Sequence, residues 1–159
     1  MVSLVTKMVL ATEDTLEEKG ILVAASETVA AMSLRVITGG DAVAFAPEQL
    51  DAFFAQHWRL EPQSDRMGAR LHGEPLQAPR REWSLGVVRG GIQVPPNGLP
   101  IILQADHQTM GGYPILGWLH PLDQWRLAQC TPRQNLGFTQ VSVSDAQHDL
   151  REFYRFFGR

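Results

Sequence analysis

The richest set of chemically useful groups in this chain lies in one glycine-rich loop, residues 106–114, directly after an apolar run at residues 101–103 that predicts a strand. Consecutive glycines allow positive φ and let backbone N–H groups approach an anion or a carbonyl oxygen closely. The loop is therefore predicted to face a substrate. The alternative is an ordinary tight hairpin, in which Asp106 caps the turn and the strand restarts at Tyr113 and Pro114. The polar and glycine positions of the loop are Asp106, Gln108, Thr109, Gly111, Gly112 and Tyr113.

Two further polar clusters stand near strand-like segments. Residues 63–68 contain Gln63, Asp65 and Arg66, and an Asp-Arg pair beside a glycine can present a guanidinium to a carboxylate or a phosphate. A polar turn with a surface ion pair is the alternative. Gln93 lies in an otherwise apolar strand, where an unsatisfied amide is costly. It is expected either to point into a pocket or to bond a neighbouring backbone group.

Several kinds of site are disfavoured by what the sequence lacks. The five histidines are scattered with no paired spacing, so a zinc site is not expected. Cys130 is the only cysteine, which excludes an internal disulfide and favours a structural or incidental thiol. No Gly-x-Ser-x-Gly elbow and no phosphate-binding loop occurs, so any ATP chemistry requires another subunit.

Length and composition indicate one globular domain, or one domain with an appendage. The 159 residues are 44% hydrophobic and 19% charged, with a net charge of −3. The one basic pair, Arg80 and Arg81, is expected in a solvated turn, so nucleic acid is not an expected partner. No stretch approaches the roughly 20 apolar residues of a membrane span, and Lys7 interrupts the N-terminal apolar run, so we expect a cytoplasmic protein rather than one with a signal peptide or a membrane anchor.

Short strands separated by Gly and Pro predict an all-β barrel with helical decorations. Residues 1–33 contain no aromatic residue and no proline and are left as an unassigned segment before a domain at 34–159. The last helix is expected to begin with a capping box at Ser144 and to carry an apolar stripe. That stripe comprises Leu150, Phe153, Tyr154 and Phe157. Expected strands lie at 34–38, 57–60, 69–72, 92–94, 101–104, 115–119 and 136–143, with helices at 47–55 and 121–129 and a turn at 95–98.

The three polar clusters, in this order, resemble one family much more specifically than any of them does alone. Residues 63–68, 86–98 and 100–114 are similar to the C subunit of prokaryotic 5-oxoprolinase, a family also described as allophanate hydrolase subunit 2 or the biotin-dependent carboxyltransferase domain. The resemblance runs from about residue 34 to about residue 143. It implies a mainly β, cyclophilin-like barrel with short helices and a C-terminal helix.

The resemblance also implies a function and partners. Such subunits work with a B-type subunit, and usually an A subunit, in ATP-dependent opening of 5-oxoproline to glutamate, while relatives fused to biotin-dependent enzymes transfer carboxyl groups to urea-like amides. We expect this chain to bind no cofactor itself. The implied site has Arg66 holding a substrate carboxylate, Asp106 orienting Arg66 or acting as a base, and the amides of Gly111 and Gly112 with Thr109 steadying an oxyanion. The implied substrate-binding positions are Gln63, Asp65, Gln93, Gln108, Thr109, Gly111, Gly112 and Tyr113.

The chain departs from the family pattern in four respects. His107 and Met110 stand where the family loop has Arg and Thr, which weakens anion binding and removes a hydroxyl, and Arg89 stands where Pro is common. Family members usually have a further half before this domain, and in this chain residues 1–33 stand in its place. The chain is therefore expected to be inactive alone and to self-associate or be unstable through exposed apolar surface. Three hypotheses remain open: an enzyme-complex subunit, a non-catalytic module that binds a B-type subunit, and a fragment without function.

Overall fold

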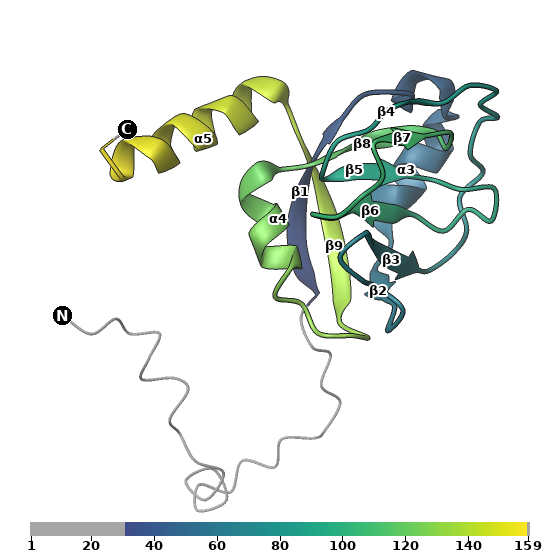
Figure 1. Ribbon diagram of the computed structural model, residues 1–159, viewed down its shortest axis with the longest axis horizontal. Helices are drawn as coiled ribbons and strands as arrows, with labels where there is room; N and C mark the ends of the chain where they lie inside the picture. Colours follow the sequence, from purple (N-terminus) through teal and green to yellow (C-terminus); the bar gives the residue numbers. More distant parts are fainter. Residues whose placement is uncertain (1–30, 159) are drawn as a thin grey trace, which may run out of the picture.

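A computed structural model describes residues 31–158 of the chain (Figure 1). Seven strands form a closed barrel in the order β1-β8-β5-β6-β3-β2-β9, and a separate two-stranded pair joins β4 to β7. The predicted mainly β barrel with short helices and a C-terminal helix is confirmed. In chain order the elements are β1 (Met32–Thr38), the 3-10 helix η1 (Ala42–Ala44), α3 (Pro47–Ala55), β2 (Trp58–Leu60), β3 (Gly68–His72), β4 (Leu85–Gly86), β5 (Gly91–Gln93), β6 (Ile101–Leu103), β7 (Met110–Gly111), β8 (Ile115–Leu119), α4 (Pro121–Leu127), β9 (Asn135–Val141) and α5 (Val143–Phe156).

The first and last strands close the barrel by pairing with each other. β1 and β9 run parallel, with Met32 opposite Leu136 and Ile37 opposite Val141, while the other neighbours in the barrel are antiparallel. The two strands lie side by side in the middle of Figure 1. Closure leaves no unpaired barrel edge, which removes a route to edge-to-edge aggregation.

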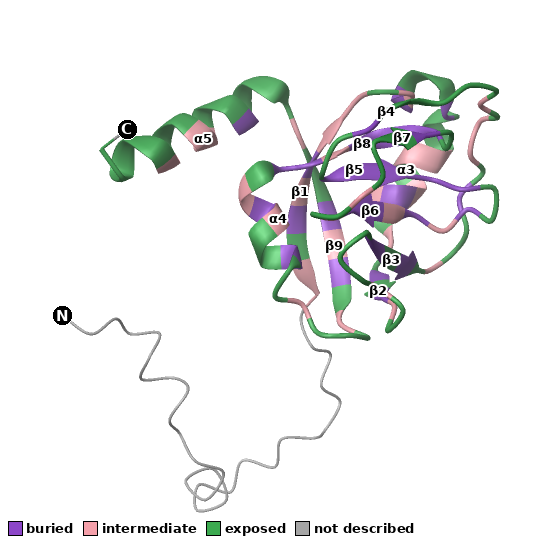
Figure 2. Cartoon of the chain, viewed as in Figure 1, coloured by how far each residue is buried: buried purple, intermediate pink, exposed green. Residues whose placement is uncertain are grey.

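The barrel core follows the two-residue alternation of its strands. Ala69 and Leu71 of β3, Ile92 of β5 and Ile102 of β6 belong to one buried cluster, so the residues next to them face outward. β5 and β6 are nonetheless buried over almost their whole length (Figure 2). Phe53 of α3 joins the same cluster. A smaller cluster of Val87, Leu103 and Ile115 lies outside the barrel wall. Part of the outer face of β6 and β8 is therefore also covered.

Aromatic side chains attach α3 to the barrel. Phe53 is fully buried and stacks on Phe138 of β9 with ring centroids 4.9 Å apart. The indole Nε1 of Trp58 donates to the Phe53 carbonyl oxygen over 3.0 Å, so the polar atom of this buried ring is satisfied. The expected helix at residues 47–55, with proline in its first turn, has the predicted bounds.

The terminal helix begins two residues earlier than the sequence indicated. Ser142, not Ser144, is the N-cap of α5, because Ser142 has extended backbone and its Oγ accepts from Asp145 N over 3.1 Å. Ser142 Oγ also donates to the Asp145 carboxylate over 2.6 Å, so the box runs from 142 to 145. The predicted capping box at Ser144 is therefore wrong in position.

α5 packs on the rest of the molecule at several positions of one face and extends away from the barrel (Figure 1). Ala146 is buried, and Phe153 meets Trp125 of α4 edge to face with centroids 6.0 Å apart. Towards its end, Phe156 is 84% exposed and Phe157 61% exposed. This aromatic surface is consistent with the expected self-association, which stays a prediction that light scattering can test.

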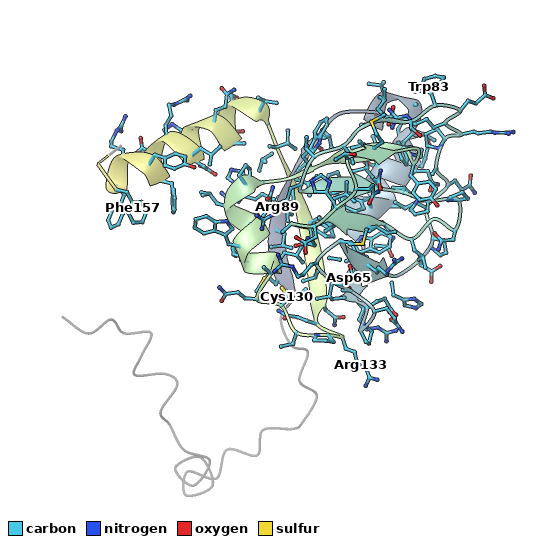
Figure 3. All side chains as sticks on the ribbon, in the orientation of Figure 1. Asp65, Trp83, Arg89, Cys130, Arg133 and Phe157 are labelled. Atoms are coloured by element: carbon cyan, nitrogen blue, oxygen red, sulfur yellow. The ribbon has the colours of Figure 1, made fainter. Side chains whose placement is uncertain are left out.

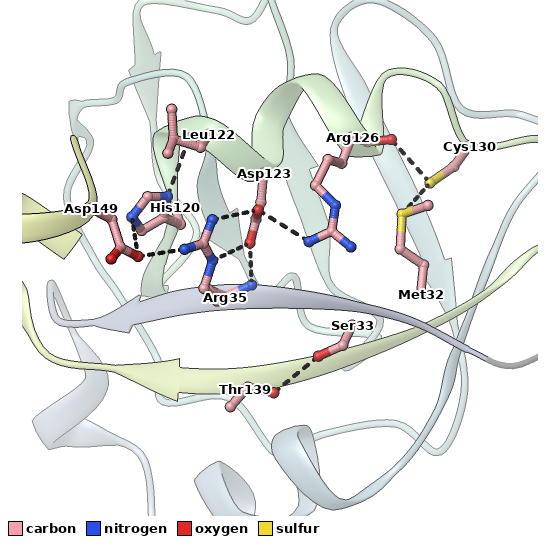
Figure 4. Close-up of polar contacts among 10 residues, drawn as sticks. All are labelled: Met32, Ser33, Arg35, His120, Leu122, Asp123, Arg126, Cys130, Thr139 and Asp149. Carbon is pink, nitrogen blue, oxygen red and sulfur yellow. Dashed lines mark hydrogen bonds and ion pairs between the residues drawn. The ribbon is translucent and has the colours of Figure 1, made fainter. Parts of the chain in front are cut away.

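A buried ion-pair cluster holds α4 and α5 against β1 (Figure 4). Asp123 is fully buried, and it accepts from Arg35 Nε over 2.9 Å, from Arg35 Nη2 over 2.8 Å and from the Arg35 backbone N over 2.7 Å. Arg35 also contacts Asp149 of α5. One guanidinium thus ties three elements that are far apart in sequence.

His120 completes this cluster as a neutral side chain. Burial, together with the positive charge of Arg35, lowers the pKa of the His120 imidazole. Its Nδ1 accepts from Leu122 N over 3.2 Å and caps α4, so the proton sits on Nε2, which lies 3.7 Å from Asp149 Oδ2. The imidazole therefore serves as a structural cap.

The described helices include none that is both long and apolar enough to cross a membrane.

We predict that Asp123→Asn lowers the free energy of unfolding by about 3 kcal/mol, because it removes the fully buried carboxylate that accepts three bonds from Arg35. The measurement is urea denaturation at neutral pH. Glu152→Gln, which breaks an exposed pair with Arg155, is the control and should change stability by less than about 1 kcal/mol. Equal effects of both substitutions would contradict the structural role of Asp123.

The same pair predicts a pH dependence. Burial alone raises the pKa of the Asp123 carboxyl, but the bonds from Arg35 and Arg126 outweigh burial and leave this pKa below its usual value. A carboxyl with a depressed folded pKa stabilises the protein above its unfolded pKa, about 3.9, and loses that contribution as pH falls through the folded value. The stability difference between wild type and Asp123→Asn should therefore shrink below about pH 4. A difference that stays constant between neutral pH and pH 3 would oppose this assignment.

Candidate functional site

Outward-facing residues of three adjacent strands form the floor of a cleft of about 350 Å³. β5, β6 and β3 are neighbours in the barrel, and the residues that alternate with their core positions point to the same outer face. The loop at 106–114 contributes Gln108 and Tyr113 to the wall. The lining consists of Asp65, Met67, Gly68, Arg70, Gln93, Pro95, Asn97, Ile101, Leu103, Gln108 and Tyr113.

Gln93 is the buried polar group of this cleft. Only 1% of its surface is exposed, and its Nε2 has no hydrogen-bond partner among residues 31–158. Its Oε1 accepts a long bond, 3.4 Å, from Gln108 Nε2. Of the two expectations for Gln93, the structure therefore supports the one in which the amide lines a pocket.

A β-bulge sits beside Gln93. Ile92 pairs with Gly117 of β8, but Gln93 pairs with Ile115, so the register shifts by one residue at this point. Bulges bend a strand and redirect side chains, and they are common next to functional sites. The shift brings Gln93 opposite the residue at which the 106–114 loop returns to the barrel.

Gly111 lets the loop close over the Gln93 amide. A Cβ at this position would lie 2.3 Å from Gln93 Nε2 and 3.0 Å from Val87 Cγ1, so any larger residue would displace a neighbour. At Gly112 the nearest heavy atom to a Cβ is Ser84 Oγ at 3.5 Å, an ordinary contact. Neither glycine has a positive φ, so the expected left-handed backbone is wrong. Gly111 is needed for close approach instead.

The interpretation of residues 106–114 as a tight hairpin is also wrong. β6 and β8, which flank the loop, are not neighbours, because β5 lies between them in the barrel. The loop instead crosses over β5 and pairs its own short strand β7 with β4, Leu85 lying opposite Gly111. The crossing explains why Gln93 of β5 is covered by this loop.

Arg66 and Asp106 form an exposed, two-bond ion pair outside the lining of the cleft. Arg66 Nε donates to Asp106 Oδ2 over 2.6 Å and Nη2 donates to Oδ1 over 3.1 Å, with 78% and 52% of the two side chains exposed. The hydrogen bonds from Arg66 hold the pKa of the Asp106 carboxyl below its usual value. Such a carboxylate is a weak base, so the geometry favours the orienting role predicted for Asp106 over the base role.

The other predicted site residues divide between neighbouring surfaces. Asp65 lines the cleft, and its Oδ1 also accepts from Met67 N and Gly68 N over 2.9 and 3.0 Å, which shapes the 65–68 turn. Gln63 lines an adjoining groove that shares Arg70 with the cleft. Thr109 is exposed and its carbonyl accepts from Val87 N over 3.0 Å. The cleft thus unites Asp65, Gln93, Gln108 and Tyr113 from the predicted set.

Two cleft residues were missed by sequence reasoning. Arg70 lies at an outward position of β3, and its guanidinium makes no hydrogen bond to another residue within 31–158. Asn97 belongs to the predicted turn at 95–98, where Gly98 has φ +75° and Gly98 N donates to Pro95 O over 2.9 Å. The alternation of β3 was the available signal for Arg70, since Ala69 and Leu71 are apolar and Arg70 is not.

A second cavity, of about 450 Å³, lies between the barrel and α4. Arg66 lines it, together with Asp65, Arg89 and Cys130, which are labelled in Figure 3. The Cys130 thiol contacts Met32 Sδ at 3.4 Å, and burial raises its pKa, which makes it a poor nucleophile. Within residues 31–158, no group of three or more His, Cys, Asp or Glu side chains is arranged to hold a metal ion.

The glycine pair provides a matched test of the cleft. Gly111→Ala should displace the Gln93 amide, lower the free energy of unfolding by about 1–3 kcal/mol through overpacking, and weaken ligand binding in the cleft. Gly112→Ala should leave all three properties near wild type. Thermal unfolding measures the stability, the amide resonances of Gln93 report its displacement, and titration with a ligand measures binding. A harmful Gly112→Ala with a silent Gly111→Ala would refute this packing.

Comparison with known proteins places the chain in a family. The family model for the carboxyltransferase domain, subdomains A and B, matches residues 4–140, and so begins ahead of residue 34. The chain is 37% identical over 126 residues to the C subunit of 5-oxoprolinase from Escherichia coli, covering 78% of this chain and 41% of that protein. It is 24% identical over 123 residues to urea amidolyase of Saccharomyces cerevisiae, covering 68% of this chain and 6% of the relative.

Solved structures support the fold. The crystal structure of the K. lactis urea amidolyase superimposes with a TM-score of 0.66 at 22% identity over 73% of this chain and 8% of that one. The chain spans about two fifths of the E. coli relative's length. The resemblance predicted from the three polar clusters is thereby confirmed, and the chain belongs to the carboxyltransferase domain family of subdomains A and B.

Proposed function

We propose that this chain is part of a subunit of an ATP-dependent complex that processes an amide or a lactam, and that the substrate is 5-oxoproline, opened to glutamate. The E. coli relative, which is named as the C subunit of 5-oxoprolinase, supports this reaction class. The observation that carries the proposal is the buried Gln93 amide, whose Nε2 has no partner among the described residues and lines the cleft. A buried donor of this kind is costly unless a ligand acceptor satisfies it.

5-Oxoproline has a lactam carbonyl and a carboxylate, and the cleft offers a matching group for each. Gln93 Nε2 would donate to the lactam oxygen, and Arg70 would bind the carboxylate. Arg66 is less suited to the carboxylate because Asp106 already occupies two of its donors. Tyr113 and Gln108 would complete the wall around the ring.

The energy source and the remaining catalytic groups are proposed to come from partner subunits. The chain has no phosphate-binding loop, so a B-type subunit and an A subunit would bind ATP and complete the site. Asp106 would orient Arg66, and the pair lies exposed and available to a partner surface.

Carboxyl transfer to a urea-like amide is the second candidate. The carboxyltransferase description of the family and the similarity to a urea amidolyase favour it. In this case a biotin carrier on another domain would deliver the carboxyl group, and the same Gln93 donor would bind the amide oxygen. Dependence of turnover on a biotinylated carrier separates this reaction from lactam opening.

Reconstitution tests the proposal directly. The full chain is co-expressed with B-type and A subunits from one 5-oxoprolinase, and glutamate formation from 5-oxoproline is measured with and without ATP. We expect ATP-dependent glutamate above the level of the two partners without the chain. Stable binding without added activity would favour a non-catalytic binding module, and no binding would reject the proposal.

Two arginines distinguish how the substrate carboxylate is held. Arg70→Gln should raise KM for 5-oxoproline about tenfold or more, because a hydrogen bond to a charged group contributes about 1.5–3 kcal/mol. Arg66→Ala should have a smaller effect on KM. Arg59→Gln, an exposed arginine of the neighbouring strand β2, is the control. Loss of binding in Arg66→Ala with normal binding in Arg70→Gln would reverse the assignment.

A further inference from the structure

Arg81 lies in a stretch without helix or strand, between β3 and β4, and yet is one of the most buried charged side chains of the fold. Only 6% of its side chain is exposed, while its neighbour Arg80 is exposed. The expected exposure to solvent is therefore right for Arg80 and wrong for Arg81, and neither residue lies in a turn. An arginine in such a position must be paired, because an unpaired buried charge is strongly destabilising.

The contacts of Arg81 converge on the end of the 106–114 loop. Arg81 Nη1 donates to the Tyr113 carbonyl oxygen over 3.2 Å and lies 3.2 Å from Asp41 Oδ2. Asp41 Oδ2 in turn accepts from Ile115 N over 2.8 Å, and Asp41 N donates to Ile115 O over 2.8 Å. Arg81 and Asp41 thus hold the backbone on both sides of Pro114.

This arrangement acts where the loop rejoins the barrel. Pro114 has no N–H to donate, and its carbonyl oxygen accepts from Val94 N over 3.0 Å. For Tyr113, the bond from Arg81 to its carbonyl oxygen is the only hydrogen bond to another of residues 31–158. Tyr113 lines the candidate cleft on one side and, on the other, a cavity of about 500 Å³ that Arg81 also lines. The backbone fixed by Arg81 is therefore the backbone that carries Tyr113.

We propose that Arg81 and Asp41 form a clamp that fixes Tyr113 against the cleft, which makes Arg81 a positioning residue for substrate binding. Arg81 Nε has no hydrogen-bond partner among residues 31–158, which indicates that its burial is not optimised for stability alone. The clamp already restricts the loop in the free protein. Binding of a ligand therefore costs less conformational entropy, and the substrate affinity is higher. The effect on affinity rests on the proposed function, whereas the effect on Tyr113 does not.

The two tyrosines of the chain, Tyr113 and Tyr154, make the clamp observable without a substrate. The full chain is labelled with fluorotyrosine, and Tyr154→Phe assigns the two ¹⁹F resonances. In Arg81→Gln the Tyr113 resonance should move toward that of free fluorotyrosine, while the Tyr154 resonance stays in place. Asp41→Asn should act in the same way, and Arg80→Gln should leave both resonances unchanged. Arg81→Lys keeps the charge and should partly restore the wild-type spectrum.

In the reconstituted complex, Arg81→Gln should raise KM at least fivefold and leave kcat within about twofold, with partial recovery in Arg81→Lys. An unmoved Tyr113 resonance in both Arg81→Gln and Asp41→Asn would overturn the clamp. A displaced resonance with an unchanged KM would overturn its role in binding. If Arg81→Gln does not fold, Asp41→Asn and Arg81→Lys carry the same comparison. A complex inactive on 5-oxoproline rejects the proposed function, while the ¹⁹F spectra decide the clamp independently.

Discussion

The cleft is organised around one buried amide. Gln93 occupies an outward position of β5, where alternation with Ile92 and Val94 of the core would ordinarily expose it to solvent. The 106–114 loop covers it instead, and a glycine at 111 is required for that approach. Because burying an amide without a partner is costly, the fold retains at this point a donor that a ligand oxygen can satisfy. The loop shields the Gln93 amide from solvent, while the cleft leaves it within reach of a ligand.

The barrel supplies the rigid frame for that arrangement. β1 and β9, which are the first and last strands of the barrel in the sequence, pair in parallel and close the sheet. The Arg35–Asp123 pair then fixes α4 against β1, at the side of the barrel where the second cavity lies. In the closed barrel β5, β6 and β3 are neighbours in that order. This order brings Gln93 and Arg70 to one face, although they come from separate parts of the chain. A site made from outward positions of adjacent strands needs such a frame, because small shifts in register would turn these side chains inward.

Local patterns in the sequence predicted most of the elements, because the alternation of apolar and polar residues and the breaks at Gly and Pro involve only neighbouring residues. The strand at 115–119 and the helix at 47–55 have their predicted bounds. β4 and β7 were not predicted, since two residues are too few to show a period. The N-cap of α5 was placed at Ser144 because Ser144 and Gln147 have the spacing of a capping box, whereas the extended backbone of Ser142 and its bond from Asp145 N make Ser142 the cap.

The site was predictable in part, through the polar loop and through the resemblance carried by three motifs. The position of Arg70 and the burial of Arg81 both depend on contacts between distant parts of the chain. The strand order places Arg70 in the cleft, and Arg81 pairs with Asp41, forty residues earlier. The crossing of the loop over β5 likewise follows from strand order, so a hairpin looked equally plausible in sequence. Nothing in the described structure tests the predicted absence of a cofactor from this chain, and the segment at 1–33 lies almost wholly outside the described residues.

Whether Gln93 is the donor to the substrate can be decided by a structure of the assembled complex with 5-oxoproline, or with a non-hydrolysable lactam of the same shape. We expect the lactam oxygen within hydrogen-bond distance of Gln93 Nε2 and the substrate carboxylate at Arg70, beneath Tyr113. A lactam bound elsewhere, with the Gln93 amide still covered and unpartnered, would show that this amide does not bind the substrate.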